Sequence, residues 1–141
     1  GIALGMALDK SGLASNIISS IPFSEFSVYL VIGASSLLAA AMANFMSNTA
    51  TANLLLPLIA ALGANMPALD QIGGSKIIIL GVTLSASLGL ALPISTPPNA
   101  LAHATGEIET KQMARIGVTM GFIGLGIIFL TLAILNWLNF V

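Results

Sequence analysis

Apolar residues fill three long blocks of the chain, and charged residues separate these blocks. No charged residue lies within 26–69, 77–106 or 116–141. A straight helix needs about 20 apolar residues, each rising about 1.5 Å, to cross the bilayer core. Residues 116–140 meet this requirement, and Trp137 near their end suits an anchor at the membrane interface. We therefore predict a plain transmembrane span over 116–140.

The first block carries polar residues at its centre. Ser47, Asn48 and Thr49 stand side by side between the runs LLAAAMA and LLLP. The arm before them is long enough to span, but the arm after them, 50–64, has only 15 residues, or about 22 Å of helix. Two arms that meet at a polar tip, one of them too short to cross, predict a re-entrant helical hairpin over 26–64. Such a tip is tolerated only where protein or a water-filled cavity surrounds it.

The second block is interrupted by proline. A helix is predicted over 76–92, and the sequence PISTPPNA, residues 93–100, then places three prolines within six positions. Proline removes a backbone donor and clashes with the preceding turn, so a helix cannot pass through. Thr96 is a good N-cap and Pro97 a good first-turn residue, so a second half-helix is expected to begin there. Residues 76–106 are therefore predicted to form one discontinuous transmembrane helix.

Composition supports a membrane location. Of the 141 residues, 57% are hydrophobic and 6% are charged, whereas a soluble domain carries about 25% charged residues. Four Lys and Arg residues and a net charge of −1 exclude nucleic-acid binding. The absence of cysteine excludes disulfides and thiolate metal sites. Because the chain opens inside an apolar stretch without Met, we expect a fragment in which 1–25 holds the end of a helix plus a loop.

The two interruptions share a chemistry that suits an anion and a cation together. Each is followed by the N-terminus of a half-helix, whose free N–H groups and partial positive charge favour an anion. The helix ends that precede them, near Met46 and near 92–95, expose carbonyls that suit Na⁺. Hairpin tips and broken helices that meet near the midplane build such sites in secondary transporters. No Arg or Lys lies in either block, so co-bound sodium would compensate the charge of a dianion, which is the physical basis of symport.

At these residues the chain resembles the divalent anion/sodium symporter family, which includes the sodium-coupled dicarboxylate, citrate and sulfate carriers. The matching stretches are SNTATANLLLP at 47–57, LALPISTPPNALAHATG at 90–106 and MARIGV at 113–118. The resemblance implies an all-α polytopic membrane protein. It also implies that this chain is the C-terminal half of an inverted-repeat, elevator-type transporter in the cell membrane. The partners it implies are the lipid bilayer, a small divalent anion, the missing N-terminal repeat and a second copy in a homodimer.

The resemblance also assigns site residues. Those placed at one substrate carboxylate are Ser47, Asn48, Thr49, Thr96 and Pro97. Those implied at one Na⁺ are the Asn48 side chain and main-chain carbonyls near Ala43, Met46 and Ser95. The chain departs from the pattern at Asn44, where many members carry an acidic residue, and this leaves the choice among C4-dicarboxylates, citrate and sulfate open.

Two other functions stay open. A related sodium/proton antiporter or arsenite-type carrier would need a titratable group near the interruptions, and His103 is the one candidate there. Alternatively, the chain is a non-transporting, truncated membrane subunit whose hairpin packs against a partner. An enzyme is not predicted, because no nucleophile–base pair or metal cluster is visible.

Glycines on the last span predict close helix packing. Gly117, Gly121, Gly124 and Gly126 form a face of small residues, and such faces allow membrane helices to approach each other closely.

Overall fold

The computed structural model describes residues 25–138 without a gap, together with 3, 6, 7, 10–13, 16, 20, 22 and 140. Most of the predicted segment 1–25 therefore lies outside the described residues. The elements bounded within the described part are all helical. They are α3 (Val28–Phe45), α4 (Asn48–Ala64), the 3-10 helix η2 (Pro67–Ile72), α5 (Ser75–Ala86), α6 (Pro97–Ala104) and α7 (Thr110–Trp137).

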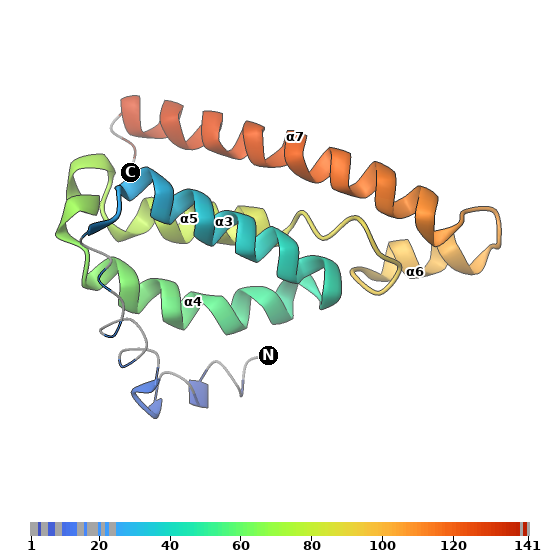
Figure 1. The fold of residues 1–141 in the computed structure, drawn as a ribbon, viewed down its shortest axis with the longest axis horizontal. Helices are drawn as coiled ribbons and strands as arrows, with labels where there is room; N and C mark the ends of the chain where they lie inside the picture. Colours follow the sequence, from blue (N-terminus) through green and yellow to red (C-terminus); the bar gives the residue numbers. More distant parts are fainter. Residues whose placement is uncertain are drawn as a thin grey trace.

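Helices α3 and α4 run in opposite directions and meet at a sharp tip, as Figure 1 shows. The C-cap Met46 and the N-cap Ser47 both have extended backbones, so the helix stops and restarts within two residues. The Ser47 hydroxyl accepts the Ala50 N–H at 3.1 Å and so begins α4. The polar motif therefore forms the turn of a helical hairpin within the predicted range 26–64.

The hydrophobic core lies between this hairpin and α5. Ala39 of α3, Leu62 of α4 and Ile78 of α5 are buried in one cluster. Leu132 brings α7 into the same cluster. Helix α5 is thus the central element, with both hairpin arms and the last helix packed around it.

The broken helix has a longer interruption than the sequence predicted. Helix α5 ends at Ala86, six residues before the predicted end at Leu92, and α6 begins at Pro97 with Thr96 as N-cap, as predicted. The physical reason is that distant side chains take over the backbone groups between the two helices. The Ala91 N–H donates to the side chain of Asn44 at 2.7 Å, so it is not free for a helical bond. We call residues 87–96 the break.

The lengths of the elements show where the break lies. Helix α7, with 28 residues, is about 42 Å long, and in Figure 1 it runs alongside α5, the break and α6 in turn. The hairpin extends only as far as the break, and α6 lies beyond its tip. The tip and the break therefore sit side by side, partway along the longest helix.

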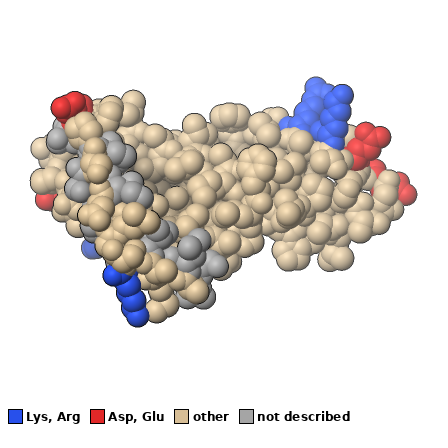
Figure 2. Space-filling model, turned by 60° about the horizontal axis from the view of Figure 1, so that its bottom comes forward, with Lys and Arg blue, Asp and Glu red and all other residues tan. Residues whose placement is uncertain are grey.

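The surface is apolar over much of the molecule. Among many large exposed side chains, Ile94 is 70% and Leu101 71% exposed. Figure 2 shows charged side chains at the two ends of one face and an uncharged stretch between them. By length and composition, α3 and α7 are each able to cross a membrane. Together these features fit an all-helical membrane protein.

Two glycines of α7 pack directly against the break. A Cβ at Gly117 would lie 2.4 Å from the Cα of Ala91, and one at Gly124 would lie 2.5 Å from the side chain of Leu88. A Cβ at Gly121 or Gly126 would meet nothing within 4 Å. The predicted small-residue face is therefore used at two of its four positions.

Gly117→Ala is expected to destabilise the protein by about 1–3 kcal/mol, because the added methyl group must push α7 away from the backbone of the break. Gly121→Ala, one turn along the same helix, is the matched control and should leave stability unchanged or slightly raised. Thermal unfolding of the purified variants in detergent measures both. Equal destabilisation by the two substitutions would show that the close approach at Gly117 is not what matters.

Candidate functional site

Hydrogen bonds join the hairpin tip to the break. The Ser95 hydroxyl donates to the Asn44 carbonyl at 2.9 Å, and the Ala91 N–H donates to the Asn44 side-chain oxygen at 2.7 Å. Nearer the tip, the Asn48 Nδ2 group lies 3.5 Å from the carbonyl oxygen of Ser87. The two interruptions that the sequence predicts as partners therefore lie against each other.

Two oxygens converge on Gly89 of the break. A Cβ placed there would lie 2.3 Å from the Ala43 carbonyl oxygen and 2.5 Å from Asn48 Oδ1. Asn48 Oδ1 is buried and has no hydrogen-bond partner, although buried polar atoms nearly always have one. Two neighbouring acceptors, one of them without a donor, fit a small hard cation, which prefers oxygen ligands.

The chemistry of this oxygen pair suits Na⁺ better than a transition metal. Its donors are a backbone carbonyl and a neutral amide, and among the described residues no group of three or more His, Cys, Asp or Glu is placed to hold a metal ion. Imidazole and thiolate ligands are those that select transition metals. The structure thus brings together two of the predicted sodium ligands, Ala43 and Asn48.

The other predicted cation ligands have different contacts. Ser95 is buried, and its hydroxyl is used in the bond to Asn44. The Met46 N–H donates to the carbonyl of Met42 at 3.0 Å, which caps α3. None of the described contacts places the Met46 or Ser95 carbonyl beside Asn48.

The predicted anion ligands lie at the first turns of α4 and α6. The hydroxyls of Ser47 and Thr96 act as N-caps, accepting backbone N–H groups of Ala50 and Asn99. Ser47, Thr49 and Pro97 are exposed. Both helix starts therefore present polar groups at the surface beside the break, where a solute can reach them.

Three residues that shape this site were not predicted from the sequence as site residues: Gly89, Asn44 and Asn99. The Asn99 side chain donates to the carbonyls of Leu90 and Leu92, at 3.3 and 3.2 Å, and so supports the non-helical break. A lone glycine shortly before a proline was the available signal for Gly89, since such a glycine often marks a close approach of backbones. Asn99 stood out in the sequence only as part of the matching stretch 90–106, and Asn44 only as a departure from the family pattern. Neither signal indicated a hydrogen bond to the break.

His103, the titratable candidate for proton coupling, lies on α6 rather than at the tip. Its Nδ1 atom is 2.9 Å from the carbonyl oxygen of Ile108, in the connection to α7. A carbonyl accepts only, so Nδ1 carries the proton. This bond holds the ring toward the connection, and no described contact joins it to Asn48 or Asn44.

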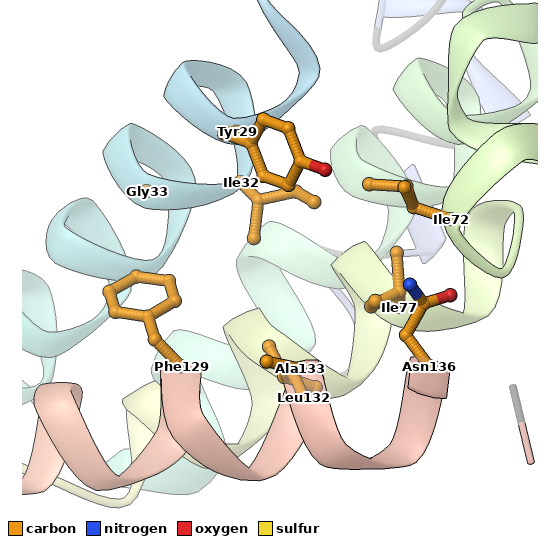
Figure 3. A pocket seen from close by; sticks show the side chains of 9 residues that line it. All are labelled: Tyr29, Ile32, Gly33, Ile72, Ile77, Phe129, Leu132, Ala133 and Asn136. Carbon is orange, nitrogen blue, oxygen red and sulfur yellow. The ribbon is translucent and has the colours of Figure 1, made fainter. Parts of the chain in front are cut away.

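A cavity of about 430 Å³ lies at the opposite end of the hairpin. Figure 3 shows aliphatic and aromatic side chains of α3, α5 and α7 around it, with Tyr29 and Asn136 as its hydrogen-bonding side chains. No Lys or Arg lines it. Such a lining does not suit a dianion, so the tip and the break remain the candidate site.

Known proteins similar to this chain cover nearly all of it. The family model described as "Sodium:sulfate symporter transmembrane region" matches residues 1–141. The chain is 32% identical over 138 residues to Na(+)/dicarboxylate cotransporter 3 of Rattus norvegicus, covering 97% of this chain and 22% of that protein. It is also 32% identical over 143 residues to solute carrier family 13 member 2 of Homo sapiens, with the same coverages. A third relative, solute carrier family 13 member 1 of Rattus norvegicus, is 30% identical over 132 residues, 92% of this chain and 21% of its own length. The chain thus spans about a fifth of the length of these relatives.

Proposed function

The chain belongs to the sodium:sulfate symporter family, a family of membrane transporters rather than enzymes, and from this membership we propose that it forms the C-terminal repeat of a sodium-coupled carrier of divalent anions. The observation that carries the proposal is the pair of oxygens at Gly89, one from Ala43 and one from Asn48, of which Asn48 Oδ1 is buried without a partner.

In this proposal Na⁺ is a co-substrate that binds beside Gly89. It takes Asn48 Oδ1 and the Ala43 carbonyl as ligands, and the Met46 and Ser95 carbonyls complete the shell. The Ala43 carbonyl near Gly89 comes from the last turn of α3, and half-helix ends are a common source of Na⁺ ligands in transporters. Binding would also satisfy an acceptor that is otherwise buried alone.

The anion binds next to the cation, at the starts of α4 and α6. Ser47, Asn48 and Thr49 hold one of its carboxylates or its sulfate oxygens, and Thr96 and Pro97 line the other side. Free N–H groups of a helix's first turn favour negative charge. Since no Lys or Arg lies within 77–106, the bound Na⁺ supplies the compensating charge, and anion binding without it is weak.

For the membrane arrangement we propose that the hairpin is re-entrant and that the break lies near mid-depth. This is supported by the hairpin's limited reach beside α7 and by the uncharged stretch between the charged ends. Non-helical backbone at such depth is tolerated only where protein or water surrounds it, and the packing of Ala91 against Asn44 and Gly117 meets that condition.

The complete carrier in this proposal is a homodimer in the cell membrane, each subunit having an N-terminal repeat that supplies the other half of the site. Its substrates are divalent anions such as C4-dicarboxylates, citrate or sulfate. The name of one relative, Na(+)/dicarboxylate cotransporter 3 of Rattus norvegicus, and the sulfate named by the family model support this substrate class.

Uptake into proteoliposomes that contain the full-length protein tests the function. Labelled succinate, citrate and sulfate are offered separately, with an inward sodium gradient or with choline in its place. We expect at least one anion to accumulate only with sodium. Accumulation driven by a pH gradient without sodium would support the antiporter-like alternative, and no accumulation of any anion would contradict the proposal.

A further inference from the structure

We propose that Asn44 is a positioning residue, whose side-chain amide fastens the hairpin to the break and thereby sets the place of the neighbouring Ala43 carbonyl. The inference rests on the proposed sodium site and adds a residue to it. It starts from three hydrogen bonds that meet at Asn44, two of them to residues 47 and 51 positions further along the chain.

Both polar groups of the Asn44 side-chain amide form hydrogen bonds. Its Oδ1 atom accepts the Ala91 N–H at 2.7 Å, and its Nδ2 group donates to the Ala40 carbonyl at 2.7 Å. The Ala91 N–H is a donor and the Ala40 carbonyl is an acceptor, so the orientation of the amide is fixed by its partners. In this chain the Asn44 side chain therefore donates on one side and accepts on the other.

By itself, the bond to the Ala40 carbonyl is a local one, of the kind that asparagine side chains often form with the backbone four residues earlier. Asn65, at the end of α4, makes the same kind of bond to the carbonyl of Ala61 at 2.8 Å, four residues back, and it is exposed. Asn44 differs because it also binds Ala91 through its side chain and Ser95 through its backbone. These two bonds hold the break at its middle, Ala91, and near its end, Ser95. Local structure does not explain them, because their partners are distant in the chain.

Asn44 affects the cation site because it directly follows Ala43 in the chain. Ala43, the residue before Asn44, contributes the carbonyl that faces Gly89, and Gly89 lies two residues before Ala91. Holding Asn44 to Ala91 therefore fixes the distance between the last turn of α3 and Gly89. Loss of that bond lets the Ala43 carbonyl move away from Asn48 Oδ1, and sodium affinity falls.

The surroundings of Asn44 provide a sharp test. It borders a groove of about 180 Å³ between α3 and α7, lined by small and apolar residues such as Ala41, Gly117 and Phe122, and no lining residue is titratable. Leucine is close to asparagine in size and suits this apolar lining, but in Asn44→Leu the Ala91 N–H loses the acceptor that lies 2.7 Å away.

The experiment measures sodium binding without any anion substrate, so that only the cation site is tested. Thermal unfolding of the full-length protein in detergent is followed against sodium concentration, since a bound ion raises the unfolding temperature. Asn44→Leu, Asn44→Ala and the control Asn65→Leu are compared with the parental protein at one pH, and the unfolding temperature of each is also measured without sodium.

We expect Asn44→Leu and Asn44→Ala to raise the half-saturating sodium concentration by about tenfold or more, because the Ala91 N–H loses its acceptor. Asn65→Leu should bind sodium with the parental affinity, since the bond it loses is the local one to Ala61. If either Asn44 variant unfolds cooperatively and binds sodium as the parental protein does, the proposed role of Asn44 is wrong. If the parental protein itself shows no sodium-dependent stabilisation, the proposed function fails with it.

Discussion

Asn48→Ala is expected to abolish sodium-dependent uptake by the full-length protein while leaving its expression intact. The substitution removes Oδ1, the buried acceptor that has no partner. A hydrogen bond to a charged group contributes about 1.5–3 kcal/mol, and we expect a similar loss for an amide oxygen that binds Na⁺. Sodium affinity should therefore fall by about tenfold to hundredfold, with anion binding falling alongside it.

The fold should survive this change. Ser47, not Asn48, caps α4, and alanine is the best helix former for the first turn. Expression and the unfolding temperature without sodium are therefore expected to stay near parental values. Uptake of the labelled anion and sodium-dependent stabilisation are measured side by side.

Asn65→Ala is the matched control for that experiment, because Asn65 caps the other end of the same helix and is exposed. It should transport at close to the parental rate. If Asn48→Ala still carried the anion at the parental rate with unchanged sodium dependence, the assignment of the cation site to Asn48 would be wrong.

Local chemistry was enough to predict where α6 begins. Thr96 and Pro97 have strong preferences for the N-cap and the first turn, and the structure places them there. Ser47, with the same preference, caps α4. These positions depend on residues within one turn of each other, so the sequence carries the information directly.

The end of α5 depends on residues that are far away in the chain. Leu88, Leu90 and Leu92 look like a continuing apolar helix, and before Pro93 only Gly89 weakens that pattern. The helix nevertheless ends at Ala86, because Asn44 and Asn99 bind backbone groups of Leu90, Ala91 and Leu92. A pattern of apolar residues cannot reveal a hydrogen-bond partner 47 positions away.

Asn44 shows the same limit for the site. In the sequence it was notable only because many members of the family carry an acidic residue at this position. That difference was interpreted as leaving the choice of substrate open. In the structure its amide is engaged with Ala91 and Ala40. The residue type indicates that the side chain has both an acceptor and a donor. Its role follows only from the packing of α3 against the break.

Gly89→Ala is expected to have the larger effect on sodium binding, because one methyl group displaces both proposed ligands. The added Cβ would lie 2.3 Å from the Ala43 carbonyl oxygen and 2.5 Å from Asn48 Oδ1, and the Ala43 oxygen belongs to the backbone, which cannot turn aside as a side chain can. Gly89 is not among the glycines with a positive φ, so the cost comes from the lack of space and not from backbone conformation. Sodium-dependent stabilisation and uptake should both be lost.

Gly33→Ala is the control for this substitution, because Gly33 lies in α3 of the same hairpin and a Cβ there would meet nothing within 4 Å. It should bind sodium with parental affinity and be at least as stable, since alanine favours a helix over glycine by about 1 kcal/mol. Purified Gly89→Ala that unfolds cooperatively and still gains stability with sodium at the parental concentration would show that the cation binds elsewhere. Loss of sodium binding in Gly89→Ala together with its retention in Gly33→Ala would tie the site to the contact between the tip and the break.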